Sequence, residues 1–218
     1  MLISCWSTKG GTGTTVVSVA LAVSLAAREA SGALLLDTAG DAPAVLGLTE
    51  PVGPGITEWL TAAAFPGDAA LARLEIDAGA GLAVIPAGSA RPVASPRTAG
   101  LSAALAGDPR PVVADCGVVT RADDPWFELA ARASVSLLVL RPCYLALRRA
   151  AAAPVRPSAV VLVQEPGRAL GRGDIEDALG VPVRAVVALD PAVARAVDAG
   201  LFAHRVPRSL AKALRSAA

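Results

Sequence analysis

Residues 7–15 read Ser-Thr-Lys-Gly-Gly-Thr-Gly-Thr-Thr, and this stretch decides the fold. A short apolar run, Leu2–Trp6, precedes it, and an alanine-rich helical pattern, Thr14–Arg28, follows it. Between a strand and a helix, glycines let the backbone approach an anion closely, and the helix N-terminus adds partial positive charge. The stretch therefore predicts a phosphate-binding loop. The stretch departs from the usual pattern of such loops at Thr14, because they carry a lysine just before the final threonine.

Apolar runs alternate with helical patterns along the whole chain. The predicted strands are Leu2–Trp6, Ala33–Asp37, Leu82–Pro86, Pro111–Asp115, Val135–Leu140, Ala159–Val163 and Val183–Ala188. The predicted helices are Thr14–Arg28, Ile56–Ala64, Thr98–Ala106, Pro125–Arg132, Tyr144–Ala152, Gly173–Leu179, Pro191–Ala199 and Ser209–Arg215. Continuously apolar strands separated by helices indicate a mostly parallel sheet that is covered on both faces. We therefore expect one doubly wound α/β domain over residues 1–218, with about seven strands.

The composition fits such a domain and excludes few partners. The chain has 218 residues, of which 54% are hydrophobic, so its core buries about 70% of the unfolded surface. Aromatic residues make up only 3%, which argues against a platform that stacks single-stranded nucleic acid. The net charge of +1 gives no general reason to expect DNA or an anionic membrane as partner, so either would need a local basic patch.

The N-terminal region has one competing interpretation. Lys9 followed by the apolar run Val16–Ala27 has the outline of a signal peptide. That interpretation leaves the glycines and threonines between them without a role, and the run is shorter than the roughly 20 residues that span a bilayer. We expect a cytoplasmic protein, with peripheral association at a membrane, a pole or the nucleoid as the alternative.

Residues that commonly bind metals are scarce and scattered. Cys5, Cys116 and Cys143 show no metal-ligand spacing, so structural thiols in a reducing compartment are expected. His204 is the only histidine and has no partner ligand nearby in sequence. A transition-metal site is therefore not expected.

Acidic residues stand where two predicted strands end. Asp37 closes one strand, Asp41 follows four residues later, and Asp115 closes another strand. A site that handles a nucleoside triphosphate needs oxygen ligands for Mg²⁺ and a group that orients water. We predict Thr15, Asp37 and Asp115 as metal ligands, and Asp37 and Asp41 as catalytic residues, to which a family resemblance of the loop adds Lys9.

The loop Lys9-Gly10-Gly11-Thr12-Gly13-Thr14-Thr15 resembles the deviant Walker A motif of the ParA/MinD-type ATPases, which are SIMIBI-class P-loop NTPases. In that motif a lysine is followed by two glycines, any residue, a glycine, a second lysine and a threonine. Weaker similarity covers most of the chain, at Leu34–Asp37, Ala44–Leu48, Leu82–Gly88, Val112–Asp115, Leu138–Pro142 and Pro166–Arg168.

The resemblance implies ATP or ADP with Mg²⁺ as cofactors. It places Lys9 across a nucleotide-sandwich dimer on the partner's phosphates, and it points to Gln164 and Pro166 for the adenine. The predicted nucleotide-binding set is Lys9, Gly10, Gly11, Thr12, Gly13, Thr14, Thr15, Gln164 and Pro166. Lys9 is also one of two lysines beside eighteen arginines, and a compact point charge suits a phosphate.

Two departures from the family pattern weaken the inference of catalysis. The family's second lysine is Thr14 here, and a further family aspartate that acts on the attacking water is Ala39. Losing one such donor costs about 10²–10³ in rate by analogy with oxyanion donors. Asp41 and a partner's Lys9 are the candidates to replace the missing groups. We therefore expect slow hydrolysis of ATP to ADP and phosphate, if any.

The basic C-terminal segment, residues 205–218, has two interpretations. Its cations are Arg205, Arg208, Lys212 and Arg215, which would contact DNA or a membrane if the segment were an anchor. Only Leu210 and Leu214 are large apolar residues in the helix, too few for firm membrane binding. A helix packed on the sheet is favoured.

Three functions follow from this pattern. The first is a ParA/MinD-like nucleotide-dependent homodimer that positions a cargo such as a chromosome locus, septum, pole or pilus machinery through an unidentified protein partner. The second is a non-hydrolysing scaffold that resembles the TadZ/CpaE-type pilus-assembly proteins. The third is a metabolic kinase or synthetase on the same nucleotide fold.

Overall fold

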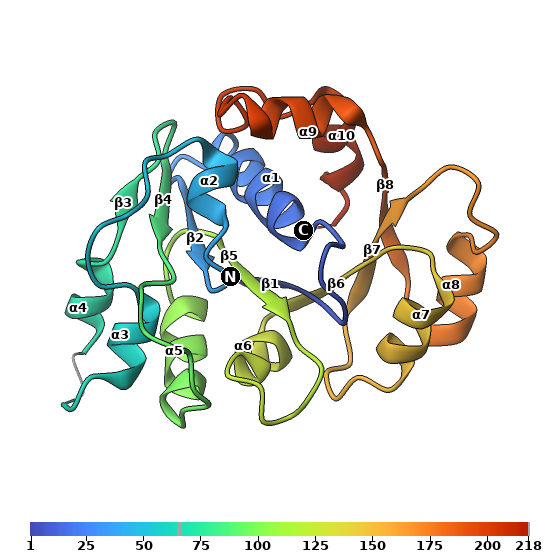
Figure 1. Ribbon diagram of the computed structural model, residues 1–218. Helices are drawn as coiled ribbons and strands as arrows, with labels where there is room; N and C mark the ends of the chain where they lie inside the picture. Colours follow the sequence, from blue (N-terminus) through green and yellow to red (C-terminus); the bar gives the residue numbers. More distant parts are fainter. Residues whose placement is uncertain (65–66, 218) are drawn as a thin grey trace.

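The computed structural model describes residues 1–64 and 67–217. Its centre is one eight-stranded sheet in the order β3-β4-β2-β5-β1-β6-β7-β8 (Figure 1). The strands are β1 Leu2–Ser7, β2 Ala33–Asp37, β3 Ile76–Asp77, β4 Leu82–Ile85, β5 Val112–Val118, β6 Val135–Leu140, β7 Ala159–Gln164 and β8 Val183–Ala188. All seven predicted strands are present and pair in parallel. The additional strand, β3, is a two-residue antiparallel edge, too short for an apolar run to reveal.

Helices cover both faces of the sheet, as expected (Figure 1). They are α1 Thr14–Ala26, α2 Ala42–Leu46, α3 Ile56–Thr61, α4 Asp68–Ala72, α5 Arg97–Ala106, α6 Phe127–Arg132, α7 Tyr144–Ala151, α8 Arg172–Leu179, α9 Pro191–Asp198 and α10 Arg208–Leu214. One apolar core joins the sheet to α1, α2 and α10, and a second core joins it to helices α3 to α8. No helix of the described residues is long and apolar enough to cross a membrane.

The central strands are buried on both sides, which explains their uninterrupted apolar sequences. Every residue of β1 and of β2 is buried. Side chains alternate along a strand, so Ile3 and Cys5 belong to the core under α1, while Leu2 and Trp6 belong to the opposite core. The Trp6 indole N–H, which needs a partner at this depth, donates to the Ser136 hydroxyl on β6 at 2.9 Å.

The order of the strands places the phosphate loop at a topological switch point. From β1 the chain crosses to β2 on one side, whereas β6 lies on the other side of β1. In open parallel sheets, ligands bind outside the carboxyl ends of strands at such a point. The loop after β1 and the end of β2 meet there, and Asp37 is the direct register partner of Asp115 in β5, which continues to Val118 beyond its predicted end at Asp115.

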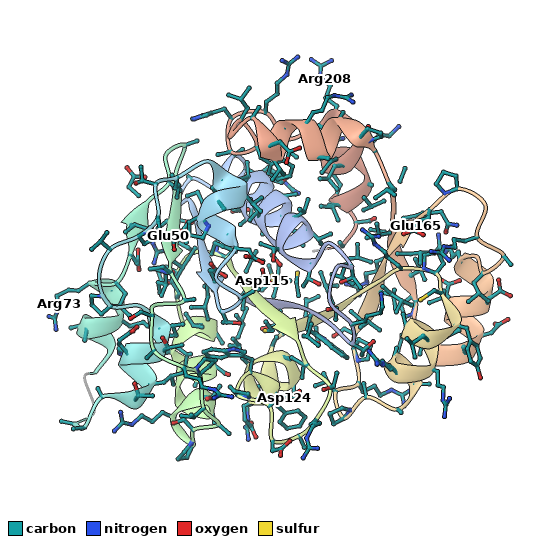
Figure 2. All side chains as sticks on the ribbon, in the orientation of Figure 1. Glu50, Arg73, Asp115, Asp124, Glu165 and Arg208 are labelled. Carbon is teal, nitrogen blue, oxygen red and sulfur yellow. The ribbon has the colours of Figure 1, made fainter. Side chains whose placement is uncertain are left out.

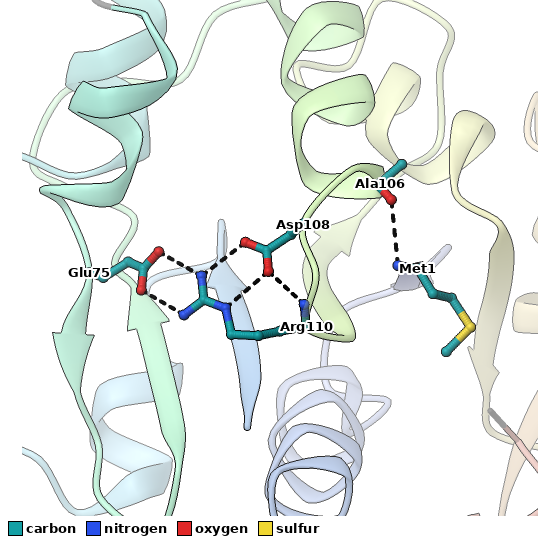
Figure 3. Close-up of polar contacts among 5 residues, drawn as sticks. All are labelled: Met1, Glu75, Ala106, Asp108 and Arg110. Carbon is teal, nitrogen blue, oxygen red and sulfur yellow. Dashed lines mark hydrogen bonds and ion pairs between the residues drawn. The ribbon is translucent and has the colours of Figure 1, made fainter. Parts of the chain in front are cut away.

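A charged network supports the sheet away from that edge. The Arg110 guanidinium donates to both carboxylate oxygens of Glu75 at 2.8 Å and also to Asp108 (Figure 3). These three side chains are mostly buried, and the two carboxylates raise the pKa of Arg110. The network ties the residue before β3 to the turn before β5, and it has the geometry of a structural ion pair.

Two short helices were not predicted, and the terminal helix is packed. α2 forms where the sequence pattern predicted no helix, because Pro43 fits the first turn of a helix and Gly47 ends it in the left-handed conformation. α4 follows Gly67. In α10, Leu210 and Leu214 are buried in the core that contains α1 and β8 residues, so neither is available to a bilayer in this structure.

Candidate functional site

The phosphate loop turns from β1 into α1 on two glycines in the left-handed region. Gly11 has φ +75° and Gly13, which precedes the first residue of α1, has φ +92°. A side chain would be strained at either position. A Cβ added there would meet no atom within 4 Å, so the restriction comes from the backbone and leaves open space above the loop.

The start of α1 presents unpaired donors. Among the described residues, the backbone N–H groups of residues 13–16 donate no hydrogen bond, and no side chain caps this end of the helix. Most helices satisfy such groups with a Ser, Thr, Asp or Asn cap. Uncapped N–H groups at a helix N-terminus form a ready anion site.

Hydrogen bonds made by side-chain hydroxyl groups fix the conformation of the loop. The Ser7 hydroxyl donates to the Lys9 carbonyl at 3.1 Å, and the Thr12 and Thr14 hydroxyls share a hydrogen bond of 2.9 Å. Thr14 is therefore buried, at 7% exposure, and its side chain is committed within the loop. It supplies no charge where the motif normally carries a lysine.

Asp37, the last residue of β2, and Asp115, in the middle of β5, lie side by side under α1 and accept different numbers of hydrogen bonds. Both are fully buried, and Asp115 lies at the centre of the molecule (Figure 2). The Asp37 carboxylate accepts from the backbone N–H groups of Ala39, Gly40 and Ala42 at 2.8–3.1 Å. Asp115 accepts only from Gly117, at 3.1 Å, and its Oδ2 atom has no partner with hydrogen-bond geometry among the described residues.

Their burial changes the charge of the site. Burial raises the pKa of Asp115 to about 6, the Thr15 hydroxyl lowers it in part, and the neighbouring Asp37 raises it further. Burial also raises the pKa of Asp37, against the three backbone donors that favour its charged form. A buried, unpaired carboxylate oxygen costs stability and is a common mark of a site that binds a cation.

A cleft of about 910 Å³ opens above the loop. Residues 10–16 form its floor, and its walls include Thr38, Asp41, Gly117, Trp126 and Asp198. In the described part of the chain, no lysine or arginine side chain lines it, and its acidic lining residues are Asp41 and Asp198. Positive potential in this cleft therefore comes from backbone N–H groups and from the end of α1.

One wall of the cleft is held by a glutamate clamp. Pro92, in the loop between β4 and α5, lines the cleft. Glu58 on α3 fixes that loop by accepting from the Ser89 and Ala90 backbone N–H groups at 2.9 and 2.7 Å. Burial works against its charge, but hydrogen bonds from Gly55, Ala90 and Ser89 lower the pKa of Glu58 to about 2.

A second cavity of about 310 Å³ adjoins the loop on the β7–β8 side. It shares Thr12, Gly13 and Val16 with the main cleft. Its remaining lining is mostly apolar and includes Val163, Val187, Leu189, Val193 and Val197. Arg141 and Asp190 add polar groups, and the buried Nε of Arg141 has no partner among the described residues. A mostly apolar cavity with a few polar groups has the character of a small-molecule pocket.

Comparison with known proteins gives a result at the level of structure alone. No protein-family model and no curated protein matches the chain. A ParA family ATPase from Chlorobium tepidum superposes with a TM-score of 0.76 at 17% identity, covering 98% of this chain and 96% of its own. MinD from Pyrococcus horikoshii, determined with Mg-ADP, gives 0.74 at 21% identity, with 97% and 91% coverage. The cell division ATPase MinD of Pyrococcus furiosus gives 0.74 at 22%, with 100% and 99% coverage.

The chain has the ParA/MinD-type fold. The predicted α/β architecture is thereby confirmed, and the resemblance first seen in the loop extends to the whole chain. The fold alone assigns no activity to this chain, and its sequence departs from the family pattern at Thr14 and Ala39.

Within the ParA/MinD-type fold, the predicted site residues fall into three groups. Gly10, Gly11, Thr12, Gly13, Thr14, Thr15 and Asp41 line the main cleft. Asp37 and Asp115 lie beneath it, and Lys9 is exposed outside its lining, with no partner for its ammonium group among the described residues. Gln164 ends β7 and Pro166 lies just after it, but neither is among the described residues that line the second cavity, whereas Val163 is. The structure does not bring these two residues to the loop.

Sequence reasoning missed Arg141, Leu189 and Asp190. Each follows a strand of the ParA/MinD-type sheet, at the carboxyl edge that carries the loop. The rule that ligands lie at that edge could have found them. Glu165, which was also overlooked, fixes Arg141 through an ion pair of 2.9 Å and pairs with Arg168 (Figure 2).

Proposed function

We propose that this protein binds an adenine nucleotide with Mg²⁺ in the cleft above residues 10–16, dimerises around it and uses the dimer to position a cellular cargo. The observation that carries the proposal is the row of unpaired backbone N–H groups at residues 13–16, at the start of α1. The adjoining apolar cavity supports a nucleotide over a simple phosphate, because its size and lining suit a base.

The residues present fit a magnesium ion. Thr15 and Asp115 would hold it, with the uncommitted Oδ2 of Asp115 as the carboxylate oxygen. Asp37 would act mainly by fixing the start of α2, since both of its oxygens accept backbone donors. No group of three or more His, Cys, Asp or Glu side chains in residues 1–64 and 67–217 could bind a metal alone. This favours Mg²⁺, which typically uses one or two carboxylates together with phosphate oxygens.

The dimer follows from the balance of charge. A cleft lined by two aspartates and no cationic side chain leaves the charge of a triphosphate to be offset by Mg²⁺ and by a second subunit. The exposed and unpaired Lys9 is the group that a partner would contribute. Exposed apolar residues, Val118, Tyr144 and Leu145, lie on segments hydrogen-bonded to the loop through Ser7 and Thr8, and they would form part of the covered surface.

Hydrolysis is expected to be slow in this account. Thr14 is short and hydrogen-bonded to Thr12, and Ala39 carries no carboxylate. Asp41 lines the cleft and makes no side-chain cap on α2, so it is the group left to orient water. One missing charged donor costs about 10²–10³ in rate.

A non-hydrolysing scaffold is the second candidate, and the absence of a cation from the described cleft lining favours it. Single-turnover hydrolysis of ATP by the wild type and by Thr14→Lys separates the two. Thr14→Ser, which retains the hydroxyl bonded to Thr12, is the matched control. We expect measurable turnover in the wild type and an increase of up to about 10²–10³-fold in Thr14→Lys only. Turnover confined to Thr14→Lys would establish the scaffold instead.

A further inference from the structure

A groove lies on the outer side of α9, away from the phosphate loop. It is formed by α9 and the segment that leads into α10, and it encloses about 880 Å³. Arg195, Arg205, Arg208 and His204 line it together with Leu201 and Val206. Arg208 projects from the top of the molecule in Figure 2, and Ala217, which follows α10, is buried elsewhere, in the core that contains α1.

The charge of this groove is uncompensated. None of its three arginine side chains makes an ion pair or hydrogen bond within the described chain, and no acidic residue lines it. Elsewhere Arg110, Arg121 and Arg132 are paired with carboxylates. Guanidinium groups are weakly hydrated and bind carboxylates in a bidentate geometry, so three of them around one groove favour an anionic occupant.

The surface between the charges is apolar. Leu201 is 49% exposed, and the small side chains of Ala192 and Ala196 also line the groove. A free phosphate or a DNA backbone would cover the arginines but would leave this leucine without an apolar neighbour. An amphipathic occupant satisfies both parts of the lining.

We propose that the α9 groove binds an acidic peptide segment of a partner protein, with carboxylates on Arg195, Arg205 and Arg208 and an apolar side chain against Leu201. This goes beyond the nucleotide function, because the groove and the phosphate cleft have no lining residue in common. α9 nevertheless borders both the groove, through Arg195, and the second cavity beside the phosphate loop, through Val193 and Val197. The test below uses no nucleotide, so its outcome is independent of the proposed function.

Fluorescence anisotropy with a labelled peptide of glutamate and leucine tests the proposal, and the same peptide with glutamine for glutamate tests its charge. The double variant Arg205→Glu with Arg208→Glu reverses the charge at two of the three arginines of the groove. Arg73→Glu with Arg156→Glu makes the same change of charge at two exposed, unpaired arginines outside it (Figure 2). We expect saturable binding by the wild type and the control, and at least about tenfold weaker binding by the groove variant and by the glutamine peptide.

Three results would overturn the proposal: no saturable binding by the wild type, equal loss in both double variants, or tighter binding of a duplex DNA than of the acidic peptide. Thermal unfolding of each variant shows whether it is folded. If the double glutamate variant does not fold, Arg205→Gln with Arg208→Gln replaces it, because it retains polar side chains. This variant should also bind the acidic peptide more weakly than the wild type does.

Discussion

Asp115 is the residue at which stability and function oppose each other. Its carboxylate is fully buried next to Asp37, and one oxygen has no partner within the described chain. A buried carboxylate with too few donors favours its neutral form, so the protein without cation is strained at neutral pH. A bound cation would remove that cost, which links metal binding to folding.

Asp115→Asn is predicted to stabilise the protein in the absence of Mg²⁺. The folded-state pKa of Asp115, about 6, lies above the ordinary value of 3.8. Its stabilising contribution is therefore fully present below pH 3.8 and is lost as the pH rises through 6. Asparagine does not titrate, so in the absence of Mg²⁺ the variant should gain stability over the wild type across this window, by up to about 3 kcal/mol at pH 8.

Urea unfolding at pH 5 and pH 8, in EDTA, measures this difference. Added Mg²⁺ and nucleotide should stabilise the wild type more than the variant, which keeps the donors at residues 13–16 but lacks the carboxylate for the cation. A variant that is less stable than the wild type at pH 8 in EDTA would contradict the assignment of Asp115 as a strained carboxylate.

At the scale of residues, the sequence indicates where a side chain lies along the chain, but it does not indicate which hydrogen bonds that side chain makes. Residues 10–15 line the cleft, and their glycine spacing is local information that the sequence carries, but their role in binding phosphate stays a prediction. That Asp37 would accept three backbone donors while Asp115 kept a free oxygen depends on the turn into α2, which the pattern did not reveal. Arg141 was missed because its role depends on β6, β7 and β8 meeting at one edge.

At the scale of elements, α2 and α9 meet through two glycines. Gly47 ends α2 with φ +75°, and Gly200 follows α9 with φ +65°. A Cβ on Gly47 would lie 2.2 Å from the Gly200 carbonyl oxygen. This backbone contact joins the helix that Asp37 caps to the helix that borders the second cavity, so it helps to fix the two sides of the site relative to each other.

The prediction here is that Gly47→Ala lowers the free energy of unfolding by about 1–3 kcal/mol, because the methyl group meets backbone atoms and the left-handed conformation disfavours a side chain. Thermal and urea unfolding measure it. Gly100→Ala is the control, since Gly100 lies within α5 and a Cβ there meets nothing within 4 Å. The control should gain about 0.5–1 kcal/mol. Wild-type stability in Gly47→Ala would show that the contact is loose.

The elements themselves were predictable where they were long and apolar. Seven strands and most helices followed from periodicity, because both faces of the sheet are buried. α2 and α4 have five residues each, and β3 has two, so their positions depend on tertiary packing more than on pattern. The last helix was placed within one residue, with its leucines packed inward.

On the scale of the whole molecule, the placement of charge argues for assembly. The chain has two lysines, of which Lys9 stands beside the loop and Lys212 lies exposed on α10. The cleft has no cation of its own among the described residues. A triphosphate in one subunit therefore gains most from a lysine that a second subunit supplies.

Lys9→Ala is accordingly predicted to abolish ATP-dependent dimerisation, measured by light scattering with Mg²⁺. Lys212→Ala makes the same change of charge and should dimerise as the wild type does. Nucleotide binding by the Lys9→Ala monomer should persist, because the donors at residues 13–16 are unaffected. A dimer of undiminished affinity in Lys9→Ala would refute the contribution of this lysine across the interface.

The central claim is that the loop binds an adenine nucleotide with Mg²⁺. Isothermal titration calorimetry of the wild type with ATP and with ADP, each in Mg²⁺ and in EDTA, tests it most directly. Because the described residues that line the cleft include aspartates and no cationic side chain, we predict saturable binding in Mg²⁺ and at least about tenfold weaker binding in EDTA for both nucleotides. Absence of binding in Mg²⁺, or an affinity indifferent to Mg²⁺, would contradict the account.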